Sequence, residues 1–153
     1  MSKILLLAED REDDVFFMER AIQRKQLPCI LRAVTDGEQA LEYLEGKGDF
    51  ANRNAFPLPS LVLLDIKMPK GDGFEALKRI RANHELARLP VVMFSTSKYQ
   101  KEIDLAYDLC ASGYMVKPSD PDELDKVLEP LIKFWFECNN PPSLNGKQAE
   151  PIG

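Results

Sequence analysis

The sequence predicts a single α/β domain in which a parallel β-sheet is covered by helices on both faces. Two observations support this fold class. Short, uninterrupted apolar runs recur five times along the chain, and each is followed by a segment with the apolar spacing of a helix. Uninterrupted runs are typical of strands that are buried on both faces, as in parallel sheets. The regular alternation of strands with helices predicts the rest of the architecture.

The expected elements can be placed in order along the chain. The expected strands are residues 4–8, 30–34, 61–65, 90–94 and 114–116. The apolar faces of the expected helices lie within residues 15–22, 40–44, 74–80, 103–110 and 124–135. Thr35 and Glu38 have the spacing of a capping box at the start of the second helix. Residues 46–60 read as a loop, and Pro130 is expected to bend the last helix without ending it, because the apolar spacing continues beyond it.

Composition and charge exclude several classes of protein. The chain has 153 residues, a net charge of −5 and three cysteines without a CxxC spacing. We expect one domain over residues 1–137 and an extended tail over residues 138–153. The acidic balance argues against nucleic acid and anionic membranes as partners, and no apolar run is long enough for a membrane span or a signal peptide. Because the cysteines are few and odd in number, we expect a reduced, cytoplasmic protein.

Polar side chains stand at the ends of four of the expected strands. Glu9 and Asp10 follow the first strand, and Asp65 ends the third. Ser95 follows the fourth strand and Lys117 follows the fifth. Because ligands of open α/β sheets bind at the carboxyl ends of the strands, we expect these five side chains to face one crevice.

Three carboxylates in one crevice need compensating positive charge. At about 4 Å and an effective dielectric constant near 20, each pair of carboxylates costs ~4 kcal/mol. Mg²⁺ suits such a set because it takes one or two carboxylates, keeps several waters and accepts phosphate oxygens. A carboxylate beside Mg²⁺ can itself become an aspartyl phosphate. Asp65 is the best candidate for that role, because it stands alone, whereas Glu9 and Asp10 are adjacent and better placed to hold the metal.

Four stretches at these strand ends resemble the receiver domain of two-component response regulators. They are Leu-Leu-Ala-Glu-Asp at 6–10, Leu-Leu-Asp-Ile-Lys-Met-Pro with Gly-Asp-Gly-Phe within 63–74, Val-Met-Phe-Ser-Thr-Ser at 92–97 and Gly-Tyr-Met-Val-Lys-Pro at 113–118. The resemblance covers residues 3–137. It implies a flavodoxin-like, doubly wound fold whose five parallel strands have the order 2-1-3-4-5 and are flanked by five helices.

The resemblance also implies a role for each residue of the crevice, with Asp65 as the phosphoacceptor. The implied Mg²⁺ ligands are Glu9, Asp10, Asp65 and the backbone carbonyl of Lys67, and the implied phosphate-binding and switch residues are Ser95, Lys117 and Tyr114. The family usually has a cis peptide bond before the proline that follows the lysine, here Pro118. Two residues depart from the common pattern, Lys67 in place of Asn and Thr96 in place of Ala, and both bear on the lifetime of the phosphorylated state.

The C-terminal part resembles a subgroup of single-domain receivers that are associated with bacterial phytochromes. Those proteins typically carry a Phe-Trp pair, here Phe134 and Trp135, and a short tail with prolines, here Pro141 and Pro142. The resemblance implies a histidine kinase, in this subgroup a phytochrome, as the phosphodonor. Output would pass to a protein target or a phosphotransfer partner, and the aromatic last helix and tail are compatible with a homodimer.

Several of these residues also have an ordinary structural interpretation. Glu12, Asp13 and Asp14 are expected to be first-turn acids of the first helix, which the helix dipole favours, rather than ligands. Ser95 could be an ordinary hydroxyl at a strand end, and Tyr114 could be a half-buried core aromatic. Phe134 and Trp135 are expected to be core residues of the last helix first and dimer contacts second.

Three functions remain open at this point. The leading hypothesis is a stand-alone receiver, a switch rather than an enzyme with an external substrate. The second is a Mg²⁺-dependent phosphatase with an aspartyl nucleophile, which is disfavoured because Lys67 stands where that class has an acid/base Asp. The third is a receiver-like scaffold that is never phosphorylated, which is disfavoured because all five site groups are present.

Overall fold

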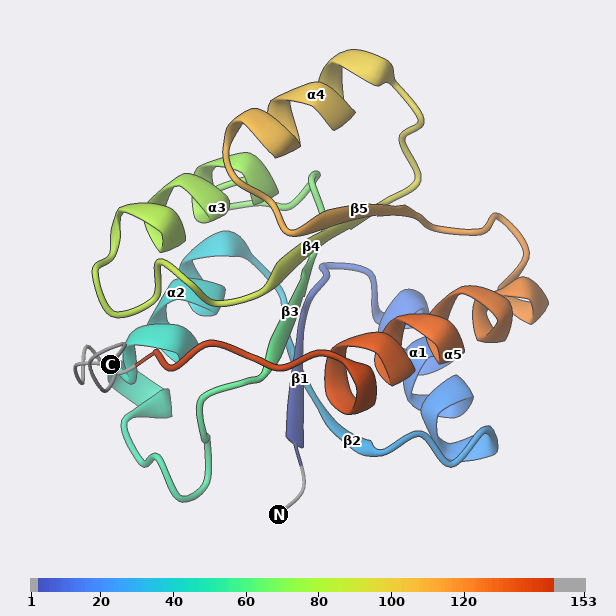
Figure 1. The fold of residues 1–153 in the computed structure, drawn as a ribbon, viewed down its shortest axis with the longest axis horizontal. Coiled ribbons are helices and arrows are strands. Elements are labelled where there is room, and N and C mark those ends of the chain that lie inside the picture. Colours follow the sequence, from blue (N-terminus) through green and yellow to red (C-terminus); the bar gives the residue numbers. More distant parts are fainter. Residues whose placement is uncertain (1–2, 145–153) are drawn as a thin grey trace, which may run out of the picture.

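The computed structural model describes residues 3–144 and contains one five-stranded parallel sheet in the order β2-β1-β3-β4-β5 (Figure 1). The strands are β1 (Lys3–Ala8), β2 (Cys29–Val34), β3 (Leu61–Leu64), β4 (Val91–Ser95) and β5 (Gly113–Val116). The expected strand order and orientation are therefore confirmed. Because β3 pairs with both β1 and β4, the carboxyl ends of these three strands lie side by side.

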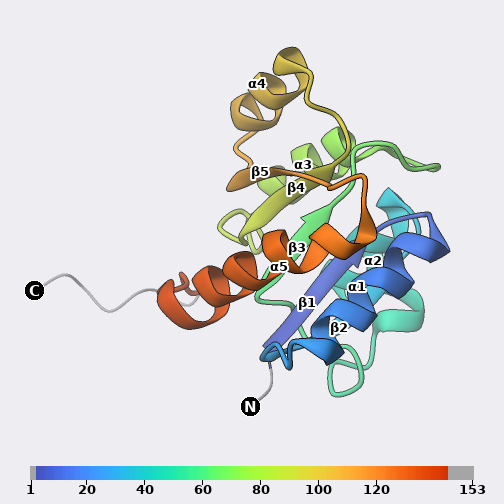
Figure 2. The same cartoon turned by 90° about the vertical axis from the view of Figure 1, so that its right-hand side faces the viewer.

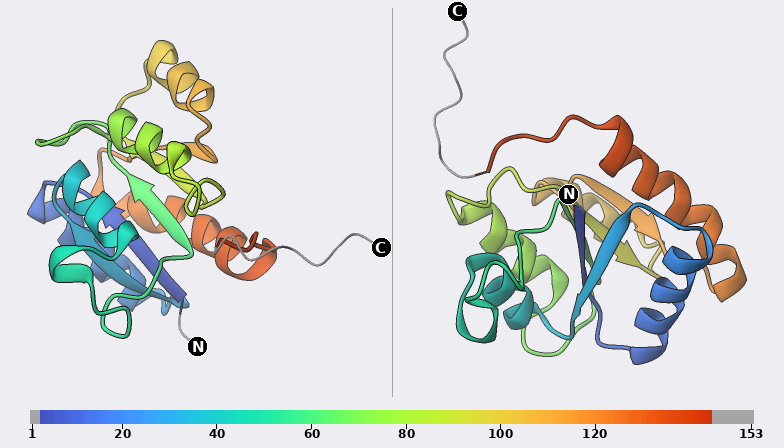
Figure 3. Two further views of the ribbon diagram at one scale, coloured as in Figure 1. Left: turned by 90° about the vertical axis from the view of Figure 1, so that its left-hand side faces the viewer. Right: turned by 90° about the horizontal axis from the view of Figure 1, so that it is seen from below.

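Helices cover both faces of the sheet. They are α1 (Glu12–Arg24), α2 (Gly37–Glu45), α3 (Gly73–Ala82), α4 (Gln100–Asp108) and α5 (Leu124–Lys133). Helices α1 and α5 lie on one face (Figure 2), and α2 and α3 lie on the other (Figure 3). Successive strand residues alternate between two cores, so that Leu6 packs with α2 and α3 while Leu5 packs with α1 and α5. Burial on both faces explains why the strands are apolar at every position.

The start of α2 uses a capping box that is one residue later than expected. The N-cap is Asp36, whose carboxylate accepts a hydrogen bond of 2.8 Å from the Gln39 backbone N–H. The Gln39 side chain in turn accepts a bond from the backbone N–H of Thr35. Asp is a better N-cap residue than Thr, which explains why the prediction from Thr35 and Glu38 was wrong by one position.

Helix α4 is shorter and less buried than its sequence pattern predicts. It ends at Asp108, and Cys110, which we expected inside it, has a φ of 68°. The backbone N–H of Ala111 donates to the carbonyl of Ala106, and this closes the helix through a left-handed residue. Ala106 is also the only residue of α4 that is fully buried.

The long connection over residues 46–60 is a loop, as expected, with one 3₁₀ turn at Gly48–Phe50. The guanidinium of Arg53, a residue of this loop, donates to the carbonyls of Tyr43 and Leu44 at 2.7 and 2.6 Å. These carbonyls belong to the last turn of α2, where helix carbonyls lack the usual partner four residues later. The Tyr43 carbonyl also accepts a hydrogen bond from the N–H of the C-cap residue Gly46. The loop therefore caps the C-terminal end of α2.

The chain beyond α5 differs from a simple continuation of the helix. Pro130 lies inside α5 without ending it, but at Phe134 the chain enters a π-helical turn, Phe134–Cys138. This change of period buries Phe136 and leaves Phe134 50% exposed, so Phe134 is not the core residue that we expected. Of the expected tail, residues 139–144 are neither helix nor strand, and residues 145–153 lie outside the described part. Leu144 packs against the core between the sheet and helices α2 and α3. No helix within residues 3–144 is long and apolar enough to cross a membrane.

Candidate functional site

Three carboxylates meet where β1 and β3 end. The hydrogen-bonded ladder continues past both strands, because the Glu9 N–H donates to Val34 and the Asp65 N–H donates to Ala8. This pairing brings one carboxylate oxygen each from Glu9, Asp10 and Asp65 within 4.8 Å of one another. Glu9 and Asp65 are only 1% and 8% exposed, whereas Asp10 is exposed. The set offers hard oxygen ligands of the kind that divalent cations prefer.

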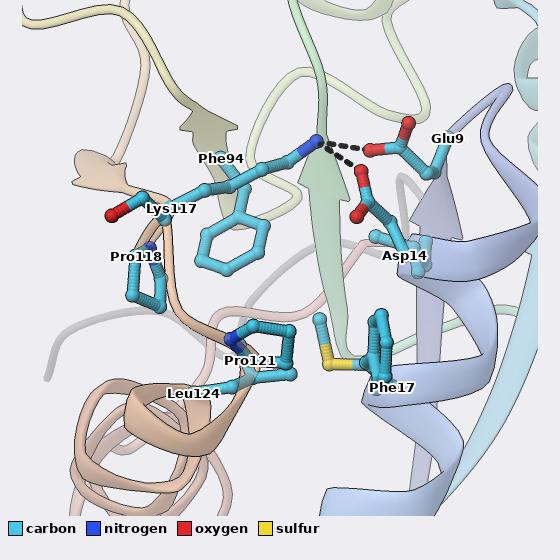
Figure 4. A pocket seen from close by; sticks show the side chains of 11 residues that line it. Glu9, Asp14, Phe17, Phe94, Lys117, Pro118, Pro121 and Leu124 are labelled. Atoms are coloured by element: carbon cyan, nitrogen blue, oxygen red, sulfur yellow. Dashed lines mark hydrogen bonds and ion pairs between the residues drawn. The ribbon is translucent and has the colours of Figure 1, made fainter.

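Lys117 supplies the positive charge that these carboxylates require. It follows β5, and its ammonium donates to Glu9 and lies 3.3 Å from Asp65 Oδ2. The same ammonium lies 3.5 Å from Asp14 Oδ2, so that a third carboxylate, from the first turn of α1, joins the cluster (Figure 4). The Lys117–Pro118 peptide bond is trans, like every peptide bond in residues 3–144, which differs from the cis bond that the resemblance implies.

Burial shifts the protonation of the Lys117 cluster. Removal from water raises the pKa of Glu9 from 4.5 to about 7, although its bond to Lys117 acts in the opposite direction. Burial also disfavours the charged form of Lys117, but the carboxylates of Glu9, Asp65 and Asp14 together outweigh this and raise its pKa. Lys117 therefore stays charged, while Glu9 holds a proton until the pH approaches neutrality.

An apolar cavity of about 70 Å³ lies against the Lys117 stem (Figure 4). Glu9, Asp14, Lys117 and Ser119 provide its polar lining. The apolar walls come from α1, β1, β4 and α5: Leu7, Phe17, Met18, Phe94 and Leu124. Apolar walls lower the local dielectric constant, and this strengthens the attraction between the ammonium and the carboxylates.

The loop that carries Asp65 is held against the start of α3. The Asp65 carboxylate accepts a bond of 2.8 Å from the Ile66 N–H, and the Gly73 N–H donates to the Ile66 carbonyl. A Cβ atom at Gly73 would lie 2.1 Å from the backbone oxygen of Asp65. Glycine at this position therefore allows α3 to begin directly against the backbone of the candidate phosphoacceptor. Lys67, two residues after Asp65, has an exposed side chain.

Ser95 and Tyr114 are linked through Ser97. The buried Ser95 hydroxyl accepts a hydrogen bond of 3.1 Å from the Ser97 N–H. The half-buried Tyr114 donates its hydroxyl to the Ser97 carbonyl at 2.9 Å, and the Ser97 hydroxyl donates to Glu102 of α4. Among residues 3–144 the O–H of Ser95 has no acceptor and can donate to another group. The loop after β4 is bonded to both β5 and α4 through Ser97.

Sequence reasoning located the strand-end residues but missed Asp14 and Ser97. Asp14 was expected to be a first-turn acid only, and it does lie in the first turn of α1. Its nearness to Asp10 in the chain was a signal that its side chain could also reach the crevice. For Ser97 the available signal was its place two residues after Ser95.

Comparison with known proteins relates this arrangement to a large family. The family model described as the response regulator receiver domain matches residues 5–129. The response regulator Rcp1 of Synechocystis sp. is 31% identical over 141 residues, which cover 92% of this chain and 94% of Rcp1.

Solved structures give the same result. The phosphorylated cyanobacterial phytochrome response regulator RcpA is 33% identical with a TM-score of 0.85, over 94% of this chain and 100% of that one. RPA3017, a response regulator in red light signalling of R. palustris, is 33% identical with a TM-score of 0.87, over 92% and 99%. The Mn²⁺-bound form of Rcp1 is 31% identical with a TM-score of 0.82, over 92% and 99%.

The close approach at Gly73 predicts an unequal response of two glycines to alanine. We expect Gly73→Ala to lower the free energy of unfolding by about 1–3 kcal/mol, because the new methyl group has no room beside Asp65. Gly113→Ala is the control, since its Cβ would lie 3.7 Å from Val92, an ordinary contact. Urea unfolding of both variants measures the difference, and equal losses would contradict the steric explanation.

The raised pKa of Glu9 predicts that the metal-free protein loses stability as the pH rises. The folded protein keeps the Glu9 proton up to about pH 7, whereas the unfolded chain loses it near 4.5. The stabilisation is therefore complete below pH 4.5 and is lost as the pH rises through 7. We expect the free energy of unfolding in EDTA to fall by at most about 3 kcal/mol over this range.

Two variants separate Glu9 from other titrating groups. Glu9→Gln should flatten the pH dependence, because the amide does not titrate. Glu12→Gln, at an exposed first-turn position, should retain it. A Glu9→Gln profile that falls as steeply as that of the wild type would assign the effect to another group.

Proposed function

The chain belongs to the response regulator receiver family, whose members are phosphoacceptor signalling proteins rather than enzymes, and on this premise we propose that Asp65 accepts the phosphoryl group. The observation that carries the proposal is the position of Asp65. It directly follows the central strand β3, is 8% exposed, and has both the acidic pair and Lys117 beside it. In this setting a nucleophilic carboxylate is held in place while cationic groups can neutralise the incoming phosphate.

The proposed reaction is an in-line transfer from a phosphohistidine of a histidine kinase. A carboxylate oxygen of Asp65 attacks phosphorus, a new O–P bond forms, and the N–P bond breaks. The bonding pair stays on the imidazole nitrogen, which then takes up a proton from water. Lys117 pairs with the phosphoryl oxygens, since the transfer requires positioning and charge neutralisation more than covalent help.

Mg²⁺ is the cation that we propose for the acidic site. The carboxylates of Glu9, Asp10 and Asp65 fit a hard cation, and the backbone carbonyl of Lys67 is proposed as a further ligand. When bound, Mg²⁺ would neutralise charge on the carboxylates and on the phosphoryl oxygens. The similar protein Rcp1 has a Mn²⁺-bound form, and this supports a divalent cation as the ligand.

The proposed switch runs from Ser95 to Tyr114. A phosphoryl group adds about 1.5 to 2 negative charges, and the free O–H of Ser95 can donate to it. Movement of Ser95 toward the phosphoryl group would pull on Ser97, and Ser97 is bonded to Tyr114 and to Glu102 of α4. The face formed by α4, β5 and α5 would then change shape and present a new surface to a protein target or a phosphotransfer partner.

The relatives favour a phytochrome-type histidine kinase as the partner. RcpA is described as a phytochrome response regulator and RPA3017 as part of red light signalling, and both match nearly the whole chain. We propose that this protein serves a kinase of the same class in the cytoplasm, where its three cysteines, all free in the structure, would stay reduced. The exposed Phe134 beside Trp135 is the proposed contact of a homodimer. The domain proposed for this activity is residues 1–137, with 138–153 as its tail.

The identity of the phosphoacceptor can be tested by intact mass. With Mg²⁺ and acetyl phosphate, the wild type should gain one phosphoryl group that hydroxylamine removes, and Asp65→Asn should gain none. Asp13→Asn is the control, because Asp13 is an exposed acid of α1 that changes the charge equally. A wild type that takes no label from acetyl phosphate or from a kinase would favour the unphosphorylated scaffold, and sustained phosphate release from a monoester would favour a phosphatase.

The metal ligands can be tested by calorimetry with MgCl₂. We expect Asp10→Asn to raise the dissociation constant for Mg²⁺ by at least about ten-fold, because even changes around a metal ligand typically cost 10–100-fold in affinity. The same variant should need correspondingly more Mg²⁺ for phosphorylation, whereas Asp13→Asn should bind as the wild type does. Equal affinity of the two variants would remove Asp10 from the site.

A further inference from the structure

Lys117 has a carboxylate partner that neither the phosphoacceptor chemistry nor the cation site uses. Asp14 Oδ2 lies 3.5 Å from the Lys117 ammonium, nearly as close as Asp65 Oδ2 at 3.3 Å. Asp14 comes from the first turn of α1 rather than from a strand end. Figure 4 shows the Lys117 ammonium with the carboxylates of Glu9 and Asp14 side by side in front of it, and all three residues line the cavity.

The number of donors on Lys117 makes this contact consequential. An ammonium has three N–H donors, and three carboxylates, those of Glu9, Asp65 and Asp14, lie around it. The Lys117 side chain is 9% exposed, so little water is available to replace a lost partner of its ammonium. A phosphoryl group on Asp65 can engage Lys117 fully only if the ammonium turns away from one of these carboxylates.

Asp14 differs from Glu9 and Asp65 in how a bound cation changes its attraction for the Lys117 ammonium. A divalent ion at Glu9, Asp10 and Asp65 would neutralise the carboxylates of Glu9 and Asp65, and so would weaken their attraction for Lys117. Asp14 is not part of that oxygen cluster, and its attraction for Lys117 therefore persists in the metal-bound protein. It is the carboxylate that still competes when the phosphoryl group arrives.

We propose that Asp14 is a positioning residue that competes with the phosphoryl group on Asp65 for Lys117. It holds the ammonium on the α1 side in the unphosphorylated protein and thereby sets how readily the phosphorylated state forms. The inference rests on the proposed function, because it takes Asp65 as the phosphoacceptor and Lys117 as the phosphate-binding lysine. The Asp14 side chain is 35% exposed, so the competition is moderate: its removal should favour the phosphorylated state by about two- to five-fold.

The test compares Asp14→Asn with Asp13→Asn. Both substitutions remove one negative charge from the first turn of α1, and both should cost similar helix-dipole stabilisation. Asp13 makes no ion pair in the described residues 3–144, whereas Asp14 contacts Lys117. Asp14 also lies 3.9 Å from the guanidinium of Arg11, so we expect a larger loss of melting temperature in Asp14→Asn than in Asp13→Asn. A purely structural role would nevertheless leave the phosphorylation chemistry of the two variants alike.

Two measurements follow the chemistry. The first is the dissociation constant for beryllofluoride, a stable mimic of the phosphoryl group, measured in saturating Mg²⁺. The second is the phosphorylation rate constant with acetyl phosphate, a dianion, and with phosphoramidate, a monoanion. In both reactions an oxygen of Asp65 attacks phosphorus, and the bond to acetate or to ammonia breaks with its electron pair.

The expected result is tighter beryllofluoride binding and faster labelling in Asp14→Asn by about two- to five-fold, by the same factor for both donors. Asp13→Asn should match the wild type. The proposal is overturned if Asp14→Asn behaves like Asp13→Asn, or if only the dianionic donor reacts faster, because the latter would show simple repulsion of the donor. Failure of the proposed function looks different, since then the wild type itself takes no phosphoryl group.

Discussion

Burial of carboxylates beside a single ammonium is the constraint on which this site depends. Glu9 and Asp65 are almost wholly removed from water, and mutual repulsion would drive them apart without Lys117 or a bound cation. Within residues 3–144 every buried side-chain nitrogen and oxygen has a hydrogen-bond partner. The cluster is therefore satisfied before any ion or phosphoryl group is added, and each ligand that arrives must redistribute partners that already exist.

The sheet topology brings these charges together. Glu9 and Asp65 follow neighbouring strands, and Lys117 reaches them from β5 at the edge of the sheet, with β4 between β5 and β3. The long lysine side chain spans this distance along the apolar ring of Phe94, whose centroid lies 5.9 Å from the ammonium. Ser95 ends β4, which lies between β3, the strand before Asp65, and β5, the strand before Lys117. The carboxyl ends of four strands, β1, β3, β4 and β5, thus contribute to one small volume, although each contributes only one or two side chains.

The features that could be predicted from the sequence are those with a local signature. Uninterrupted apolar runs identify the strands, and polar residues at the ends of these runs identify Glu9, Asp10, Asp65, Ser95 and Lys117. Features that depend on packing between distant segments had no such signature. The contact of Asp14 with Lys117, the burial of Phe136 in place of Phe134 and the end of α4 before Cys110 all follow from tertiary structure. Periodicity shows which residues share a face, but it does not show which neighbour that face will meet.

The slight burial of α4 has a mechanical consequence for the whole molecule. This helix contributes one fully buried residue, Ala106, whereas α2 contributes five and α3 four. The loop that carries Asp65 packs directly against the start of α3 at Gly73, so there is no room for this loop to move toward α3. On the side of Ser97 the neighbouring element is α4, and an element with few apolar contacts is displaced at little cost in free energy. Strain created at Asp65 is therefore expected to relax by movement of the loop after β4 and of α4, and not by movement of α3.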